Sequence, residues 1–235
     1  LKYSGAGDTS IAGVSFKAYR GQTIGIIGGT GSGKSSLVGL IPRFYDATEG
    51  EVLIDGVNVK DIKLEELRDK VGIVMQKAVL FKGSIRNNMQ VAKQDATDGE
   101  IDEALAIAQA KEFVDKKDGR LDYMIEQGGK NLSGGQRQRL TIARAVVKKP
   151  DVLILDDSAS ALDFATDAAL RKSIRTMPNN PTVFIVSQRS ASLMHADKII
   201  VLDDGNVAGI GTHSELLANC EVYREIYNSQ FKSAK

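Results

Sequence analysis

Short apolar runs, each bounded by glycine or by polar residues, recur along the chain and are typical of buried β-strands. They cover residues 24–27, 71–75, 152–155, 183–186 and 198–202. Segments whose apolar residues have helical spacing separate these runs, starting with residues 34–40. Because strands alternate with helices, the pattern predicts an α/β fold with a mainly parallel sheet.

An antiparallel lobe is expected near the N-terminus. Residues 51–54 and 57–59 carry strand-forming side chains on both sides of Asp55-Gly56, a dipeptide that favours a two-residue hairpin turn. A hairpin pairs its strands antiparallel, so we expect a mixed fold with both parallel and antiparallel pairing.

The middle of the chain has a different pattern. From residue 84 to residue 149 the apolar positions follow a helical period. Pro150 ends this region because proline cannot continue a helix. The predicted division of residues 1–235 is a core made of 1–76 and 150–235, with an inserted helical subdomain over 77–149.

The composition excludes several functional classes. The 31 basic residues nearly balance the 30 acidic ones, so the net charge is +1 and nothing marks a nucleic acid or an anionic membrane as a partner. The single cysteine, Cys220, cannot form an internal disulfide, which favours an intracellular protein. No apolar run approaches the roughly 20 residues that a membrane-spanning helix requires.

A glycine-rich loop follows the first apolar run and precedes the first predicted helix. It matches the pattern G-x-x-x-x-G-K-[ST], in which glycines let backbone N–H groups curl toward phosphate oxygens and the helix N-terminus favours anions. Lys34 is expected to reach the β- and γ-phosphates of ATP, and Ser35 is expected to bind Mg²⁺. The expected nucleotide-binding residues are Gly28, Gly29, Thr30, Gly31, Ser32, Gly33, Lys34, Ser35 and Ser36.

Two carboxylates end a later apolar run. Asp156 and Asp157 follow residues 152–155, and α/β proteins bind ligands at the carboxyl ends of their parallel strands. Asp156 is expected to hold Mg²⁺, and Asp157 to act on the water that attacks the γ-phosphate. Taken alone, the pair fits a helix N-cap equally well, and it is the phosphate loop that favours the catalytic role.

The run Leu132-Ser133-Gly134-Gly135-Gln136, followed by a predicted helix over residues 137–147, resembles the signature sequence of the ATP-binding cassette (ABC) ATPases. With the phosphate loop, it identifies the chain as a member of that family, which implies a P-loop NTPase core. The resemblance also implies that two cassettes pair head to tail, with Ser133, Gly134, Gly135 and Gln136 of one closing on the ATP of the other. The segment is physically a second anion site at a capped helix start.

Further segments resemble the family in the same order along the chain. Tyr3 resembles the aromatic residue that stacks on adenine, although a half-buried strand tyrosine fits the position too. Gln76 resembles the glutamine that contacts Mg²⁺ and links to the membrane domain. Residues 80–88 are similar to the exporter segment that follows this glutamine. Asp163 ends the run Ser160-Ala161-Leu162-Asp163, which resembles the loop that crosses to the opposite nucleotide site.

The exporter resemblance also implies partners. The expected partners are a second nucleotide-binding domain and a transmembrane domain of the same polypeptide. This domain is expected at the cytoplasmic face of a membrane, and nucleic acid is not expected as a partner. Because exporters carry the membrane domain before the cassette, we expect Leu1 to lie inside a longer polypeptide. Gln127 stands where exporters often have a glutamate, which leaves the contact of this segment with the membrane domain open.

Two positions depart from the family pattern where hydrolysis takes place. Asp157 replaces the usual glutamate, the general base, and its carboxylate is set back by roughly an ångström or more because one methylene is missing. Gln188 replaces the usual histidine at the γ-phosphate, and a neutral amide cannot become a cation. General acid-base catalysis contributes about 10²–10⁴-fold, so a catalytic set of Lys34, Gln76, Asp157 and Gln188 is expected to bind ATP and hydrolyse it slowly.

Several functional hypotheses stay open. The favoured one is a degenerate-site subunit of a heterodimeric exporter, whose partner supplies the missing glutamate and histidine. A homodimeric exporter that tolerates both changes is an alternative, and so is a regulatory module that uses ATP only to hold a dimer together. Soluble ABC proteins of translation or DNA repair fit less well, because the chain has a single cassette, no sustained heptads and no basic stripe.

The two histidines, His195 and His213, lack the sequence spacing of metal ligands. His213 follows Gly211-Thr212 at an expected helix start, so a capping or surface role is predicted for it.

Overall fold

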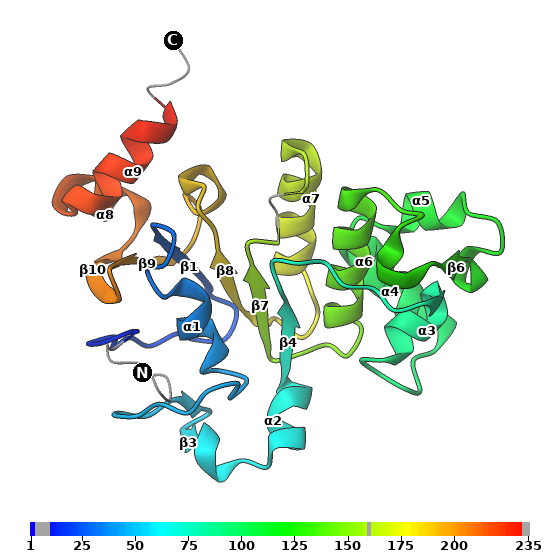
Figure 1. The fold of residues 1–235 in the computed structure, drawn as a ribbon, viewed down its shortest axis with the longest axis horizontal. Coiled ribbons are helices and arrows are strands. Elements are labelled where there is room, and N and C mark those ends of the chain that lie inside the picture. The colour runs from blue at the N-terminus through cyan, green and yellow to red at the C-terminus, as the bar shows by residue number, and fades with distance from the viewer. Residues whose placement is uncertain (3–9, 159–160, 232–235) are drawn as a thin grey trace. The chain divides into compact units, whose positions relative to one another are not determined.

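Figure 1 shows a computed structural model of the chain, which describes residues 1–2, 10–158 and 161–231. Residues 1–71 and 182–235 form one unit of the fold, and residues 72–181 form the other. The expected limits of the helical subdomain, 77–149, rest on sequence motifs and stay a prediction.

Four neighbouring strands of the first unit follow the order β10-β9-β1-β8. They are β1 (Thr23–Gly28), β8 (Thr182–Val186), β9 (Lys198–Asp203) and β10 (Asn206–Gly211). Strand β1 runs parallel to both β8 and β9, while β10 runs antiparallel to β9. The predicted mixed pairing is confirmed, and the burial of every residue of β1 explains the apolar run over residues 24–27.

Strand β10 has no counterpart among the predicted strands. Its residues alternate between exposed and half-buried positions, and glycine or alanine occupies several of them, so no run of large apolar side chains marks it. Its partner β9 is fully buried over residues 199–202. Pairing with this buried neighbour, rather than intrinsic β-propensity, makes residues 206–211 a strand.

The predicted hairpin forms, with strands shorter than expected. These are β2 (Leu53–Ile54) and β3 (Val57–Asn58), in which Ile54 pairs with Val57. Asp55 and Gly56 have φ angles of 52° and 80°, and two positive φ values are what a type I′ turn needs. Within the described residues of the first unit, the antiparallel lobe near the N-terminus consists of this hairpin.

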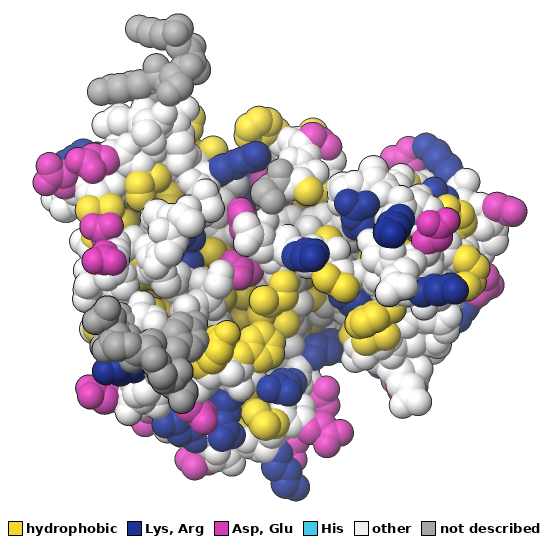
Figure 2. Space-filling view, viewed as in Figure 1, with side chains coloured by type: hydrophobic (Ala, Val, Ile, Leu, Met, Phe, Trp, Pro, Cys, Tyr) yellow, Lys and Arg dark blue, Asp and Glu magenta, His cyan; other side chains and the backbone are white. Residues whose placement is uncertain are grey.

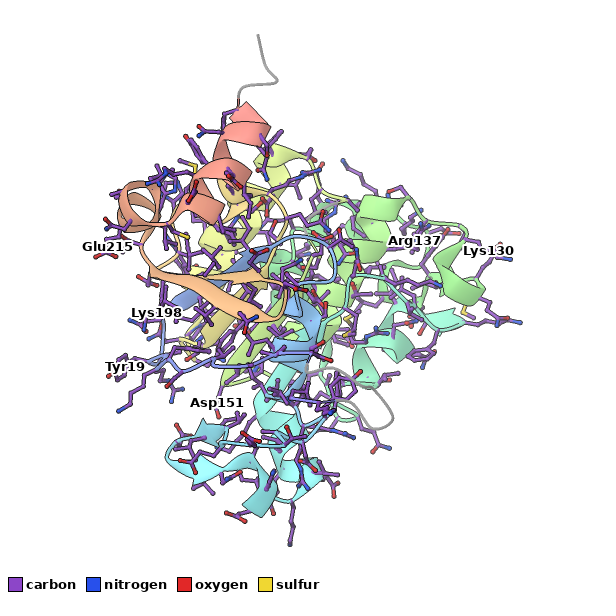
Figure 3. The ribbon with its side chains drawn as sticks, turned by 60° about the vertical axis from the view of Figure 1, so that its left-hand side comes forward. Tyr19, Lys130, Arg137, Asp151, Lys198 and Glu215 are labelled. Carbon is purple, nitrogen blue, oxygen red and sulfur yellow. The ribbon has the colours of Figure 1, made fainter. Side chains whose placement is uncertain are left out.

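Four helices and two 3₁₀ turns belong to the described part of the first unit. They are α1 (Lys34–Gly39), η1 (Val59–Asp61), α2 (Leu64–Lys70), η4 (Ser190–Ser192), α8 (His213–Asn219) and α9 (Glu221–Phe231). Thr212 caps α8, since its side chain accepts the N–H of Glu215 while the Glu215 carboxylate accepts the N–H of Thr212 at 2.7 Å. The hydrogen bonds that Thr212 donates to the Glu215 carboxylate, from its N–H first and its hydroxyl second, lower the pKa of Glu215, which Figure 3 labels at the start of α8.

His213 is half-buried and packs against α9. Its Nδ1 lies 2.8 Å from the hydroxyl of Tyr223, and its ring centroid lies 5.3 Å from that of Tyr227. Tyr223 is fully buried, and burial raises the pKa of its hydroxyl to about 12. The capping role predicted for His213 belongs to Thr212, while His213 itself is half-buried, with one side of its ring against the aromatic residues of α9.

The second unit holds two neighbouring strands and most of the helices. The strands are β4 (Val71–Val74), which starts at its boundary, and β7 (Val152–Asp156). The helices and 3₁₀ turns are α3 (Ile85–Gln90), α4 (Asp98–Ile107), α5 (Lys111–Asp115), η2 (Arg120–Asp122), η3 (Gln127–Gly129), α6 (Gly134–Val146) and α7 (Phe164–Arg175). None of the helices in the described ranges combines the length and apolar character needed to cross a bilayer.

The helical middle also contains a small sheet that the periodicity did not predict. Strands β5 (Gly83–Ser84) and β6 (Met124–Ile125) pair antiparallel, with Ser84 opposite Met124. Strands this short leave no alternating pattern in the sequence, so only the folded chain reveals them.

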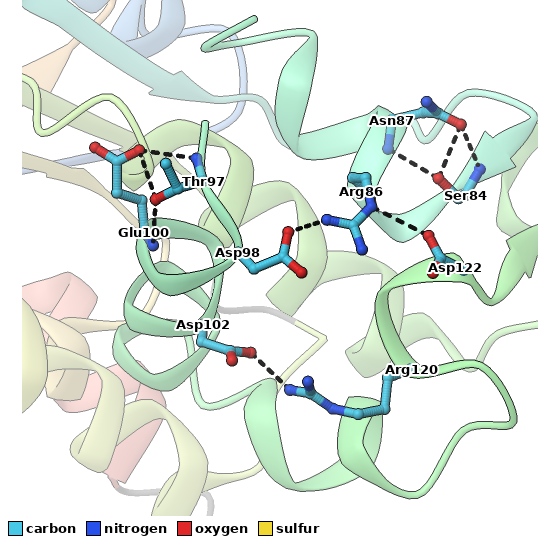
Figure 4. Close-up of polar contacts among 9 residues, drawn as sticks. All are labelled: Ser84, Arg86, Asn87, Thr97, Asp98, Glu100, Asp102, Arg120 and Asp122. Carbon is cyan, nitrogen blue, oxygen red and sulfur yellow. Dashed lines mark hydrogen bonds and ion pairs between the residues drawn. The ribbon is translucent and has the colours of Figure 1, made fainter. Parts of the chain in front are cut away.

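Figure 4 shows the capping boxes at the starts of α3 and α4. The Ser84 side chain accepts the N–H of Asn87 at 3.0 Å and begins α3, and Thr97 accepts the N–H of Glu100 at 3.3 Å and begins α4. Glu100 also pairs with Lys93, and this interaction is the largest cause of lowering its pKa to about 2.

Ion pairs join these helices to the turn before β6 (Figure 4). The Arg86 guanidinium of α3 binds Asp98 at the start of α4 and Asp122 at 3.1 Å. The Arg120 guanidinium lies 2.7 Å from Asp102 of α4. Because these pairs are partly exposed, they contribute modestly to stability but fix the arrangement of the helices.

Candidate functional site

The loop between β1 and α1 is a close-fitting turn with one open face. Gly31 and Gly33 have φ angles of 83° and 92°, which L side chains rarely adopt. A Cβ at Gly28 would lie 2.2 Å from the carbonyl oxygen of Leu202, so only glycine fits there. A Cβ at Gly29 or Gly31 would meet no described atom within 4 Å. The backbone therefore has the shape of a phosphate cradle.

Lys34 folds back over this loop. Its Nζ donates to the carbonyl oxygens of Gly28 at 2.9 Å and Gly29 at 2.7 Å. Phosphate oxygens are stronger acceptors for an ammonium group than neutral carbonyls are, so a bound phosphate would compete for Lys34. Ser32 Oγ is buried and has no hydrogen-bond partner among the described residues. An ammonium group at the loop and an unsatisfied buried hydroxyl both fit an anionic ligand.

The two carboxylates end β7 as predicted. Asp156 is the last residue of the strand and is buried, while Asp157 follows it with a φ of 45°. This left-handed conformation is uncommon for a residue other than glycine and is a feature of functional turns. Oδ2 of Asp157 accepts a hydrogen bond from Nε2 of Gln76 at 3.2 Å. The fold thus brings together two predicted site residues that are 81 positions apart.

Gln188 lies next to the strand that leads into the phosphate loop. Strands β1 and β8 run parallel with Ile26 opposite Val186, and the N–H of Ser187 donates to the carbonyl oxygen of Ile26 at 3.1 Å. The side chain of Gln188 is exposed. Within the first unit, the predicted γ-phosphate residue and the predicted phosphate loop therefore follow the same edge of the sheet.

The signature segment begins α6. The helix starts at Gly134, ahead of the predicted residue 137, so both signature glycines lie in its first turn. Ser133 Oγ accepts the N–H of Gln136 at 3.2 Å, and Gln136 Oε1 accepts the N–H of Ser133 at 3.1 Å. This capping box uses the Ser133 hydroxyl only as an acceptor, so capping does not consume its O–H as a donor to an anion. Ser133 and Gly134 are both exposed.

Two arginines hold this segment in place, and the sequence did not single them out. Arg137, labelled in Figure 3, donates to the carbonyl oxygens of Leu132 at 2.7 Å and Gly129 at 3.3 Å. A Cβ at Gly129 would lie 2.7 Å from Cδ of Arg137, so glycine is needed for this contact. Arg139 donates to the carbonyl oxygen of Gln109 at 2.8 Å. Both arginines bind backbone carbonyls, and such targets leave no trace in a sequence pattern.

Asp163 caps α7 in the second unit. Its Oδ1 accepts the N–H of Thr166 at 2.9 Å, and this hydrogen bond is the largest cause of a lowered pKa at Asp163. A Cβ at Gly135 would lie 3.3 Å from the carbonyl oxygen of Ala161, so the signature helix closely approaches the segment before Asp163. Tyr3 and Ser160, also predicted from the family pattern, lie outside the described residues.

The donors proposed for a metal are oxygen atoms from different residue types. Ser35 is exposed on α1, Gln76 is exposed after β4 and Asp156 is buried at the end of β7. Hydroxyl, amide and carboxylate oxygens are ligands that suit Mg²⁺, which also takes oxygens from phosphates. In the part of the chain that the structure describes, no three or more His, Cys, Asp or Glu residues form a metal-binding group.

Charges of both signs share the surface. On the face shown in Figure 2, Lys and Arg side chains are interspersed with Asp and Glu, as the net charge of +1 leads one to expect. The prediction that nucleic acid is not a partner rests on this balance and stays a prediction.

Residues 11–160 match a protein-family model described as ABC transporter. The chain is 44% identical over 235 residues to an uncharacterized ABC transporter ATP-binding protein of Mycobacterium tuberculosis (strain ATCC 25618 / H37Rv), covering 99% of this chain and 40% of that protein. It is 39% identical over 232 residues to the ATP-dependent lipid A-core flippase of Haemophilus ducreyi, covering 98% of this chain and 40% of the flippase.

The fold is similar to that of a solved bacterial Atm1-family ABC exporter with ATP bound. The TM-score is 0.91 at 33% sequence identity, and the match covers 97% of this chain and 41% of the exporter chain. The chain thus spans 40% of the length of the curated relatives described above.

Proposed function

Because the chain belongs to the ABC transporter family, as an ATP-binding ATPase domain of the exporter type, we propose that it drives the conformational cycle of an exporter. Support comes from the relatives' names, which describe an ABC transporter, a flippase and an exporter. We propose that a transmembrane domain of the same polypeptide accompanies it and that the domain works at the cytoplasmic face of a membrane. The contacts to the transported compound are expected in that other domain.

ATP binding is assigned first to the phosphate loop. The positive φ angles of Gly31 and Gly33, the ammonium of Lys34 and the buried hydroxyl of Ser32 support this assignment, since together they fit a chain of phosphates. Tyr3 is proposed to stack on the adenine. Ser133 to Gln136 are proposed to bind the ATP of a second cassette, which the exposure of Ser133 supports.

Mg²⁺ is assigned to Ser35, Gln76 and Asp156. When bound, the ion would neutralise charge on the phosphate oxygens. The chain's own contribution is to hold the oxygen donors, and the burial of Asp156 at the end of β7 supports its part in this role.

Asp157 is proposed as a weak general base. In hydrolysis, the oxygen of water bonds to the γ-phosphorus, the bond from that phosphorus to the β–γ bridging oxygen breaks, and the water proton passes to the carboxylate. Oδ2 of Asp157 already accepts from Gln76 at 3.2 Å, so this carboxylate oxygen is shared between the amide and any water. A shorter side chain with a shared oxygen favours slow turnover.

The single observation that carries the proposal concerns the residues assigned to the nucleotide, because among these only the two with roles in hydrolysis differ from the family pattern. Asp157 and Gln188 depart from the family pattern, while the phosphate loop, Asp156 and the signature keep it. We therefore propose that the chain is the degenerate-site partner in a heterodimeric exporter. Its own ATP site turns over slowly, and its signature completes an active site on a partner that carries the missing glutamate and histidine.

The test measures Mg-ATP affinity and steady-state hydrolysis for the purified 235-residue chain and for the double variant D157E/Q188H. The wild-type chain is expected to bind Mg-ATP with little turnover. The double variant regains a longer base and a titratable imidazole, so its kcat is expected to rise at least about tenfold, a small part of the range for acid-base catalysis.

Other outcomes would favour the alternatives. Brisk wild-type turnover that rises with the square of the protein concentration would mean that Asp157 works as a base in a self-paired dimer. Tight binding with no turnover in either protein would favour a regulatory ATP-binding module. The variant K34A should lose Mg-ATP affinity in every case and serves as the control for binding at this site.

A further inference from the structure

We infer that Gln230, near the end of α9, is a positioning residue that holds the backbone of the Gln188 turn for its role at the nucleotide. Nε2 of Gln230 donates to the carbonyl oxygen of Gln188 at 2.7 Å. Oε1 of the same amide accepts the N–H of Ser190 at 2.8 Å and the hydroxyl of Ser190 at 2.9 Å. The inference rests on the function proposed above for Gln188.

A single side-chain amide thus closes the turn from both ends. A carbonyl oxygen and an N–H two residues later need a donor and an acceptor side by side, which a carboxamide provides and neither a carboxylate nor an ammonium does. Ser190 is fully buried, whereas the side chains of Gln188 and Arg189 are exposed. The contact therefore fixes the backbone of the turn while the Gln188 side chain faces outward.

The other end of the turn is tied to the strand that enters the phosphate loop. Ser187 donates its N–H to Ile26 of β1 at 3.1 Å, and its hydroxyl accepts the N–H of Arg189 at 3.0 Å. Gln188 therefore lies between a fixed point on β1 and a fixed point on α9. Removing the second fixed point should loosen Gln188 without disturbing the phosphate loop itself.

Helix α9 is itself firmly placed, so it can act as a support. Tyr223 is fully buried, and Tyr227 packs between His213 and Phe231, with ring centroids 5.3 Å and 4.4 Å away. Gln230 lies on the last turn of this anchored helix and is itself exposed. Its replacement should therefore leave the packing of α9 intact.

The decisive experiment is a double-mutant cycle in the 235-residue chain. Mg-ATP affinity and the single-turnover rate of ATP hydrolysis are measured for wild type, Q230A, Q188A and Q230A/Q188A. We expect Q230A to lower the Mg-ATP affinity, the single-turnover rate or both by about 3- to 10-fold, which is the range for lost hydrogen bonds of ordinary strength. Because Gln230 acts through Gln188, the same change should have almost no effect in the Q188A background.

A second variant and a matched control separate positioning from general loosening. Q230E keeps an acceptor for the N–H of Ser190 but has no donor for the carbonyl oxygen of Gln188. Exchange at the Ser190 amide should therefore stay as slow as in wild type. Mg-ATP affinity and the single-turnover rate should fall as they do in Q230A. Asn228 is exposed on the same helix, so N228A should change neither the amide exchange at residues 187–190 nor the two ATP measurements. In Q230A, amide hydrogen exchange at residues 187–190 should accelerate by about 3- to 10-fold.

Two results would overturn the inference. One is a Q230A effect on ATP that persists in full when Gln188 is already alanine. The other is exchange at residues 187–190 that is as slow in Q230A as in N228A. The failure of the proposed function would look different, because it would appear without any change at Gln230: the wild-type chain would fail to bind Mg-ATP, or would turn it over briskly, or D157E/Q188H would not regain turnover. The exchange result would still report on the contact.

Discussion

The Ser133 hydroxyl caps α6 and is also proposed to bind the ATP of a second cassette, and substitutions can test the capping role by itself. As an N-cap it accepts the N–H of Gln136, so Ser133→Ala should lower the free energy of unfolding by about 1 kcal/mol. Ser133→Asp should keep the cap, since aspartate is an equally good N-cap, and retain near-wild-type stability. Chemical denaturation of the three proteins measures this difference.

The control is a capping box that belongs to no proposed site. Thr97→Ala removes the corresponding bond at the start of α4 and should cost about the same stability as Ser133→Ala, since both are exposed N-caps. If Ser133→Asp loses as much stability as Ser133→Ala, the hydroxyl has a structural role beyond capping.

The glycines of the phosphate loop should differ in how they tolerate alanine. At Gly31 a methyl group meets no described atom within 4 Å, so only the φ of 83° is strained, at a cost of about 1–2 kcal/mol. At Gly28 the methyl would lie 2.2 Å from the Leu202 carbonyl oxygen, so the backbone must shift and the loss should be larger. Urea denaturation of both variants gives the order, and a costlier Gly31→Ala would contradict the loop geometry.

At the scale of elements, the packing of α8 on α9 predicts a pH dependence. Burial is the largest cause that lowers the pKa of His213 from 6.5, with the charge of His195 second. Tyr223 and Tyr227 face the imidazole from α9. Because the unfolded chain binds a proton at this histidine more readily, stability is full above pH 6.5 and decreases as the pH falls through the folded pKa.

The measurement is the free energy of unfolding between pH 7.5 and pH 5. His213→Gln should flatten this profile in the acidic range, whereas His195→Gln should retain most of the slope, since burial of His213 is unchanged. An equal slope in wild type and His213→Gln would mean that other groups control the acid response.

Local motifs were predictable because a few neighbouring residues determine their geometry. The phosphate loop needs glycines at positive φ before a helix, and Asp55-Gly56 supplies both positive φ values of a hairpin turn. Strand β10 and the β5–β6 pair were not predictable, since short or mixed segments become strands only through their partners.

The contacts that support the site were also beyond the sequence. Gln76 meets Asp157 across 81 positions, and Gln230 meets Gln188 across 42. Arg137 binds a backbone carbonyl, and any residue can provide one. A motif indicates which chemistry is present, whereas the groups that hold the motif in place depend on tertiary packing.

At the scale of the whole molecule, the proposed roles of the site residues separate ATP binding from ATP cleavage. The phosphate loop, Asp156 and the signature keep the family pattern, and among the residues assigned to the nucleotide the changes fall on Asp157 and Gln188. With the function proposed above, we expect this domain to spend most of its cycle with nucleotide bound. In a paired assembly its own ATP site would then stay occupied, and ATP hydrolysis at the partner's site would determine the rate at which the dimer opens and closes.

If ATP is bound but cleaved slowly, Mg-ATP should cause a long-lasting increase in the Tm of the chain. A ligand that binds only the folded state adds about 2.7 kcal/mol to stability at 100 times its Kd, so saturating Mg-ATP should raise the Tm of the wild-type chain. The shift should disappear in Lys34→Ala and persist in Lys63→Ala, a control whose side chain is 85% exposed.

The duration of the Tm shift distinguishes ATP that stays bound from ATP that is hydrolysed. If wild-type hydrolysis is slow, the Tm shift produced by a limited amount of Mg-ATP should last for hours of incubation. In D157E/Q188H the same amount should be consumed, and the Tm should move toward the value measured with Mg-ADP. An equally fast loss of the Tm shift in both proteins would mean that Asp157 and Gln188 support hydrolysis as well as glutamate and histidine do. The chain would then have an active ATP site of its own.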